Sequence, residues 1–69
     1  MAWRDDLRER LPRGDIPVFL TDLQALVAAL REGRPWAQRL TPRLRDHPDL
    51  VLGYLDPGPG RDAVADALR

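Results

Sequence analysis

Apolar residues recur at helical spacing near the start of the chain. Three of them lie four residues apart and share one helix face: Trp3, Leu7 and Leu11. This pattern predicts a first helix that ends at Pro12, because proline is not tolerated in a helix interior. Residues 15–20 are also largely apolar, but Pro17 lies among them. We therefore expect an extended segment there, lying across the core.

Capping signals mark a second helix. Thr21 and Gln24 have the spacing of a capping box, and Gly33 followed by Pro35 is typical of a helix end. The sequence therefore predicts a helix at about residues 22–32. Its main apolar face comprises Leu23, Leu26, Val27 and Leu30.

The opposite side of this helix carries alanines where a surface helix normally carries charges. The residues concerned are Ala25, Ala28 and Ala29, with Glu32 at the edge. High helix propensity is one sufficient reason for alanine at exposed positions. Close approach of a second helix, from this chain or another, is the other. These four residues are the candidate partner interface.

A third helical segment is expected at about residues 35–46. Its inward positions are Trp36, Ala37, Leu40 and Leu44. Pro42 interrupts the pattern, so two outcomes are open. Either the helix kinks at Pro42, or Thr41 caps a new short helix that starts there.

A further helix start follows this segment. Asp46 or His47 is suited to cap it, with Pro48 at the first position and Asp49 in the first turn. The tripeptide His47-Pro48-Asp49 also resembles the signature of J-domain co-chaperones, although the resemblance covers only these three residues. Residues 50–55 are apolar on every side, so we expect them to be buried, and Pro48 and Asp49 favour a helix over a strand.

The chain therefore predicts an all-α fold, a single domain over residues 1–69. We expect four or five short helices in a compact orthogonal bundle around the second helix. A proline- and glycine-rich turn at residues 56–60 precedes the last helix, whose apolar residues are Ala63, Val64, Ala67 and Leu68. The predicted core comprises Leu26, Leu30, Trp36, Leu40, Leu44, Leu52 and Leu55.

Composition narrows the possible functions. The chain has no cysteine, lysine or serine, so the usual nucleophiles and the thiolate ligands of zinc are missing. Its one histidine, His47, and the scattered aspartates lack a recognised metal-ligand spacing. We expect no enzyme activity, no catalytic residues, no metal and no cofactor. The residue usage is typical of a GC-rich bacterial genome, and the absence of an apolar leader favours a cytoplasmic protein without membrane contact.

A chain of 69 residues has a marginal core, and association with a partner is one way to add burial. The preferred function is therefore a noncatalytic protein–protein interaction module, an adaptor or regulatory protein that forms a homodimer. A small subunit or regulator of a larger enzyme is a further possibility.

The alternative is a small nucleic-acid-binding accessory protein. Net charge is zero, but residues 31–45 carry five arginines against one glutamate. The candidate contacts to an anionic partner are Arg31, Arg34, Arg39 and Arg43. A helix-turn-helix motif around Gly33 is not supported, because Arg39 takes a position that should be buried and Pro42 falls inside the recognition helix.

Overall fold

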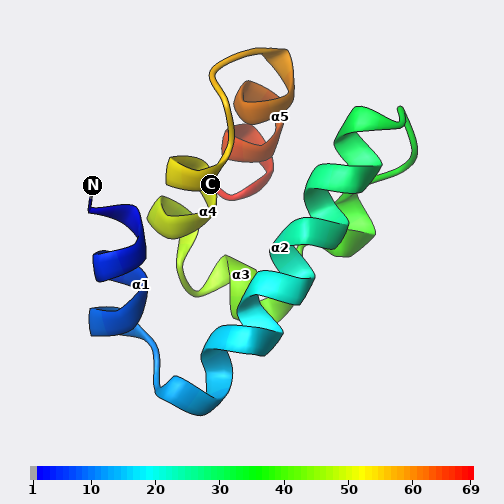
Figure 1. Cartoon of the computed structure of the whole chain (residues 1–69). Coiled ribbons are helices and arrows are strands. Elements are labelled where there is room, and N and C mark those ends of the chain that lie inside the picture. Colours follow the sequence, from blue (N-terminus) through cyan, green and yellow to red (C-terminus); the bar gives the residue numbers. More distant parts are fainter. Residues whose placement is uncertain (1) are drawn as a thin grey trace.

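The computed structural model describes residues 2–69 and shows an all-α protein, as predicted. Five α-helices and two short 3-10 turns make up the described chain, with no strand among residues 2–69 (Figure 1). The α-helices are α1 (Trp3–Arg10), α2 (Ile16–Arg31), α3 (Pro42–Arg45), α4 (Pro48–Tyr54) and α5 (Pro59–Ala67). The 3-10 turns are η1 (Arg13–Asp15) and η2 (Ala37–Arg39). The orthogonal packing of the bundle stays a prediction.

The start of α2 corrects the sequence prediction. The helix begins at Ile16, so the expected extended segment is wrong, as is a start near residue 22. Pro17 lies in the first turn, where a missing N–H costs nothing because that donor has no helical acceptor. Thr21 is inside the helix and its Oγ1 donates to the Pro17 carbonyl over 2.9 Å. The predicted capping box is therefore wrong as well.

The end of α2 confirms the prediction. Gly33 has φ 67°, a left-handed conformation that favours glycine. The Arg34 N–H donates to the Ala29 carbonyl over 3.0 Å, as expected where a helix closes on such a glycine. The chain then turns back, and η2 packs on α2.

The interrupted third segment forms two short pieces, η2 and α3. Thr41 is the N-cap of α3, and its Oγ1 accepts from the Leu44 N–H over 3.4 Å. Pro42 occupies the first helical turn. Of the two open outcomes, the new helix capped by Thr41 is therefore the one observed. The helix start predicted at Pro48 is also confirmed, with His47 as its N-cap residue.

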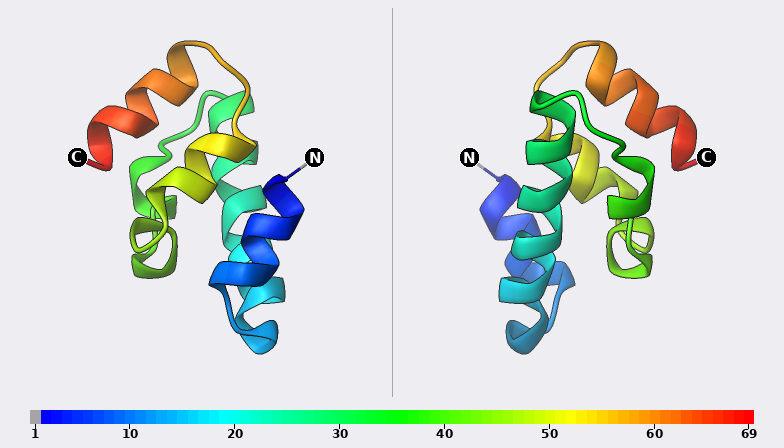
Figure 2. Two further views of the ribbon diagram at one scale, coloured as in Figure 1. Left: turned by 90° about the vertical axis from the view of Figure 1, so that its left-hand side faces the viewer. Right: turned by 90° about the vertical axis from the view of Figure 1, so that its right-hand side faces the viewer.

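Two helices share the centre of the fold. α2 packs on η1, η2 and α3, whereas the shorter α4 packs on α1, α3 and α5. Figures 1 and 2 show α1 and α5 lying beside α4 at different sides of the molecule. The expectation that every helix packs around α2 is therefore too simple.

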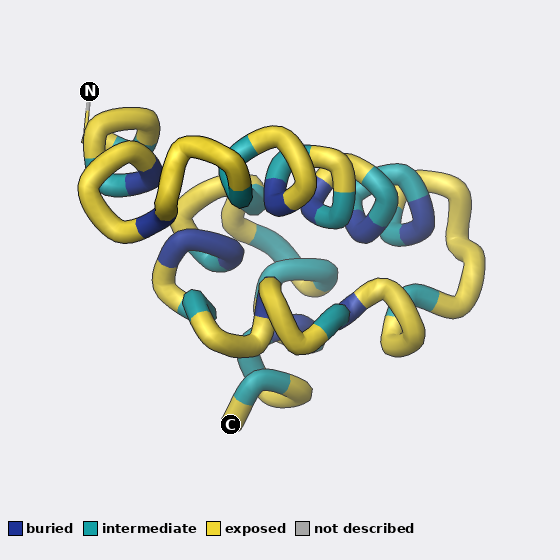
Figure 3. Tube along the Cα trace, turned by 90° about the horizontal axis from the view of Figure 1, so that it is seen from below, coloured by how far each residue is buried: buried dark blue, intermediate teal, exposed yellow. Residues whose placement is uncertain are grey.

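The buried residues come from all five helices and from the segments between them (Figure 3). The main apolar cluster comprises Leu7, Leu11, Phe19, Leu23, Leu26, Leu40, Leu44, Leu50, Val51 and Val64. Of the predicted core, Leu26, Leu40 and Leu44 are buried. The other four members are partly buried and pack against the cluster: Leu30, Trp36, Leu52 and Leu55.

Trp3 fastens α1 to α4. Its indole Nε1 donates to the Leu50 carbonyl over 2.7 Å, and its ring centroid lies 4.9 Å from that of Tyr54. Gly53 allows this approach, because a Cβ at that position would lie 3.1 Å from Trp3 Cδ1. Arg10 and Asp49 form an ion pair between the same two helices.

Candidate interaction site

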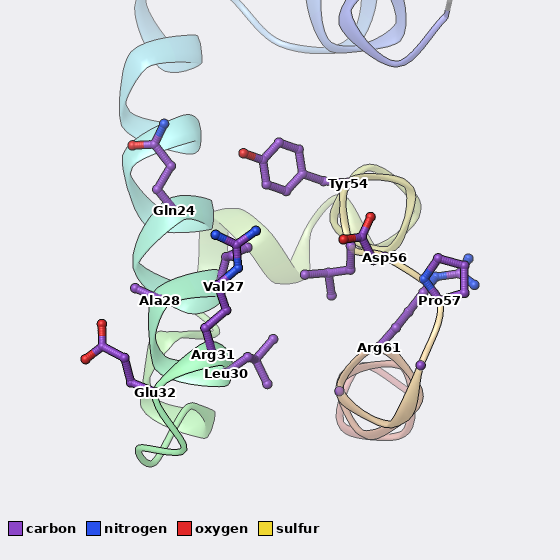
Figure 4. A pocket seen from close by; sticks show the side chains of 13 residues that line it. Gln24, Val27, Ala28, Leu30, Arg31, Glu32, Tyr54, Asp56, Pro57 and Arg61 are labelled. Carbon is purple, nitrogen blue, oxygen red and sulfur yellow. The ribbon is translucent and has the colours of Figure 1, made fainter.

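An open cleft lies between the C-terminal half of α2 and the turn that joins α4 to α5 (Figure 4). Its volume is about 710 Å³. On α2 it is lined by Gln24, Val27, Ala28, Leu30, Arg31 and Glu32. On the other side it is lined by residues of 54–58 together with Gly60 and Arg61. Two segments far apart in sequence thus build one surface.

The α2 wall combines apolar and polar side chains. Val27, Ala28 and Leu30 supply the apolar part and are each partly buried. Gln24 and Arg31 are exposed one turn away on the same side of the helix, and Figure 4 shows the Arg31 side chain running along this wall. A partner placed here would meet both apolar surface and hydrogen-bonding groups.

The opposite wall is a tight turn held against α4. Tyr54 ends α4 and is 40% exposed. Gly58 has φ 156°, a conformation that side-chain-bearing residues rarely adopt, so the turn requires glycine there. The Arg61 Nε donates to the Leu52 carbonyl over 3.0 Å, which ties the start of α5 to α4. This wall of the cleft is therefore held by contacts between α4 and the start of α5.

Some charged residues around the cleft form ion pairs and others do not. Glu32 and Arg34 form an ion pair of 2.9 Å at one edge. By contrast, no ion pair within residues 2–69 involves Arg31, Arg61 or Asp56. The cleft therefore presents two guanidinium groups and one carboxylate to solvent without a partner of opposite charge.

The predicted partner interface is only partly on this surface. Ala28 and Glu32 line the cleft, and Ala25 is half-buried on the same helix outside the lining. Ala29 is 2% exposed, so its predicted position on an exposed seam is wrong. Of the two explanations for the alanines, the burial of Ala29 fits close approach of another segment of this chain, since η2 packs against α2.

The predicted arginine contacts are dispersed over several elements of the fold. Arg31 lines the cleft, Arg34 pairs with Glu32, and Arg39 is exposed on η2. Arg43 Nη1 lies 3.9 Å from Asp22 Oδ2. The fifth arginine, Arg45, uses its Nε to donate to the Leu40 carbonyl over 3.1 Å.

The residues that sequence reasoning missed are on the far wall: Tyr54, Asp56 and Arg61. They belong to a run of apolar residues, a turn and a helix start, none of which signals a site by itself. The available signal was the turn at residues 56–60. A rigid turn holds the side chains on either side of it in fixed positions, which a binding surface requires.

No metal centre is found among the described residues. No group of three or more metal-ligating side chains occurs within residues 2–69. His47 lies edge-on to Phe19, with ring centroids 6.1 Å apart, so the histidine has a packing role at the start of α4. A second hollow of about 380 Å³ lies beside it, lined in part by Leu11, Pro42 and Arg43.

Comparison with protein-family models, curated proteins and solved structures finds no match for this chain. Within residues 2–69, no helix has both the length and the apolar character that crossing a membrane requires. The geometry of the cleft is therefore the basis for inferring function.

Proposed function

We propose that the protein is a noncatalytic protein–protein interaction module, and that the cleft between α2 and the α4–α5 turn is its docking surface. The observation that carries this proposal is the combination of an apolar wall with unpaired charges in one open cleft. Protein interfaces combine an apolar centre with a polar rim that gives specificity. An adaptor or regulatory role in a bacterial cytoplasm remains part of the proposal.

The openness of the cleft favours a protein over a small ligand. Its volume of about 710 Å³ is within the range of small-molecule sites, so size alone does not decide. Such sites bury about 70–90% of their ligand, however, and this cleft is open along one side (Figure 4). A helix or loop of a partner protein is better suited to cover it.

The surface area of the chain also supports association. A monomer of 7.8 kDa is expected to expose about 4400 Å², and this chain exposes 4806 Å². The excess is consistent with a groove that no element of the chain fills. A partner in the cleft would add burial to a small core.

A nucleic-acid-binding role is the alternative. It rests on the arginines of residues 31–45, several of which already have partners within the chain. Dispersed cations neutralise few phosphates at once, which limits affinity for nucleic acid. The exposed Arg39 is the main feature in favour of this alternative.

A single-cysteine photo-cross-linker tests the docking surface. Because the chain has no cysteine, Gln24→Cys gives one attachment point on the cleft wall. Illumination in a host-cell extract should yield a protein adduct that mass spectrometry identifies. The identified protein, once purified, should bind the parent chain at least about tenfold more tightly than the Ala28→Arg variant, which fills the cleft with bulk and charge.

The matched control is Arg13→Cys, which places the same label on exposed η1, away from the cleft (Figure 1). This control should give no such adduct. Adducts that disappear after nuclease treatment would favour the nucleic-acid alternative. Equal labelling from both positions, or binding unchanged by Ala28→Arg, would overturn the proposal.

A further inference from the structure

The outer face of α5 is an uncovered surface of defined charge. Val64 is buried against the core, and the opposite side of the helix is exposed. Asp62 and Asp66 lie there at positions i and i+4, which places them on one face, and Arg69 follows the end of the helix. Ala63 and Ala65 lie at the two edges of this face and are partly buried. Small side chains allow another helix or wall to approach closely.

The outer face of α5 is acidic, and the cleft has unpaired arginines. Asp62 and Asp66 lie on the α5 face, and no ion pair within residues 2–69 involves Asp62. The cleft is lined by Arg31 and Arg61 together with Glu32 and Asp56, and neither arginine is in an ion pair. Asp66 and Arg69 approach within 3.6 Å of one another, but their side chains are 73% and 81% exposed. Such exposed pairs contribute little to stability and exchange readily for a partner's charges.

The two surfaces also adjoin each other. Gly60 and Arg61 line the cleft and belong to the first turn of α5. The outer face of α5 therefore continues directly from one wall of the cleft. A surface that contains both a cleft and the helix that fits it can pair with a second copy of itself about a twofold axis.

Area considerations favour a reciprocal arrangement. A stable interface buries about 800 Å² on each partner, which is about a sixth of the 4806 Å² that this chain exposes. The outer face of the short helix α5 alone would bury only a small part of this area. When each copy contributes both its cleft and its α5, both surfaces are covered at once.

We propose that the cleft is occupied by α5 of a second copy of this chain, in a twofold pair in which each copy both gives and receives the helix. This inference rests on the proposed function, because it names the occupant of the same docking surface. The aspartates of one α5 meet the unpaired arginines of the other copy's cleft, and the alanines allow close contact. Electrostatic complementarity of this kind fixes partner choice and register.

Charge reversal on either surface tests the proposal. Sedimentation equilibrium of the parent, from about 1 to 500 μM at low salt, should show a monomer–dimer equilibrium that weakens as salt is raised. Asp62→Arg with Asp66→Arg should raise the dimer dissociation constant by about tenfold or more, because attraction becomes repulsion. Arg31→Glu should act in the same direction.

An equimolar mixture of these two variants gives the sharpest result. In a mixed dimer, the cleft with the Arg31→Glu substitution receives the α5 that carries the two arginine substitutions. The other cleft and the other α5 keep their parental charges. Both contacts are therefore attractive. The mixture should therefore dimerise more tightly than either variant alone. A mixture of Arg31→Glu with the double variant Asp5→Arg, Glu9→Arg has the same net charges and should not show this rescue, because α1 does not enter the cleft.

The matched control is Asp5→Arg with Glu9→Arg. These exposed residues have the same spacing on α1, and Asp5 lies in the first turn of its helix as Asp62 does in α5. The control should leave dimerisation unchanged, and circular dichroism should show that all variants are folded. If the arginine variants unfold, Asp62→Asn with Asp66→Asn provides a milder change and should still weaken the dimer severalfold.

A parent chain that stays monomeric throughout this range would overturn the inference. So would a dimer that is insensitive to the α5 variants. The proposed function is tested separately. A dimer that is insensitive to the α5 variants, or a heterologous complex formed by a monomeric parent, would retain the cleft as docking surface if Ala28→Arg disrupts it, while excluding α5 as its occupant.

Discussion

Two parts of α2 share one apolar pattern but differ in what covers them. Phe19, Leu23 and Leu26 are completely buried. Leu30 continues the same stripe one turn later and is only partly buried, because it lines the cleft. Helical periodicity therefore identifies the apolar side of α2, whereas the rest of the chain decides how much of that side is covered.

The difference follows from the neighbouring elements. Phe19 has the His47 ring beside it, and the first part of the helix faces η1 and the segments near α3. At Leu30 the neighbour from α5 is a glycine, Gly60, where an added Cβ would lie 3.7 Å from Leu30 Cδ2. A small residue at this point leaves the floor of the cleft open.

The sharpest test of this contrast uses two adjacent alanines. Ala29→Arg should destabilise the protein by more than about 3 kcal/mol, because it forces a long charged side chain into a buried site. That loss is enough to unfold so small a domain. Ala28→Arg, in the cleft, should cost less than about 1 kcal/mol. Circular dichroism melting curves measure both; similar melting temperatures for the two variants would contradict the assigned burial.

The second test compares truncations along the stripe. Leu23→Ala should cost about 3 to 5 kcal/mol, because it leaves a cavity in the covered part of the core. Leu30→Ala should cost about 1 to 2 kcal/mol, because part of its surface already faces water. Urea denaturation, extrapolated to water, gives both free energies of unfolding. Equal costs would mean that the cleft is filled in solution.

The smallest expected effect is at the cleft edge. Arg34→Ala removes the ion pair with Glu32, in which both side chains are 57% exposed. The free energy of unfolding should change by less than about 0.5 kcal/mol, because exposed pairs are weakened by water and salt. The same urea experiment measures it, and a loss above about 1 kcal/mol would show that Arg34 has a structural role beyond this pair.

Sequence reasoning recovered the fold class and most helix positions because the signals involved are local. The inward positions of Leu7, Leu40 and Leu44 follow from helical spacing, and the end of α2 follows from Gly33. Pro42 marked an interruption, but the sequence did not distinguish a kink from the new helix that is observed. The prediction at Pro17 was wrong because the effect of proline depends on its position: proline breaks a helix interior but fits a first turn. Only the backbone upstream of Pro17 distinguishes these cases.

The cleft was less accessible to sequence reasoning because it is a tertiary feature. Ala28 and Ala29 are the same residue type at adjacent positions, so the sequence does not distinguish them. The path of the chain after Gly33 leaves Ala28 partly exposed and Ala29 buried. Arg31 and Arg61 belong to different elements and carry no pattern that relates them. Their common placement follows from the packing of α4, which no local signal specifies.

The hydrogen bond from Trp3 to the Leu50 carbonyl has a consequence for folding kinetics, since it joins residues 47 positions apart. Pairs such as α3 with α4 and α4 with α5 are neighbours along the chain and close short loops, which is fast. Docking of α1 on α4 must close the longest loop and carries the largest entropic cost of closure. The arrival of α1 is therefore expected to be the slow step of folding, and the emission of the Trp3 indole, changing as it meets Tyr54, would follow that step in real time.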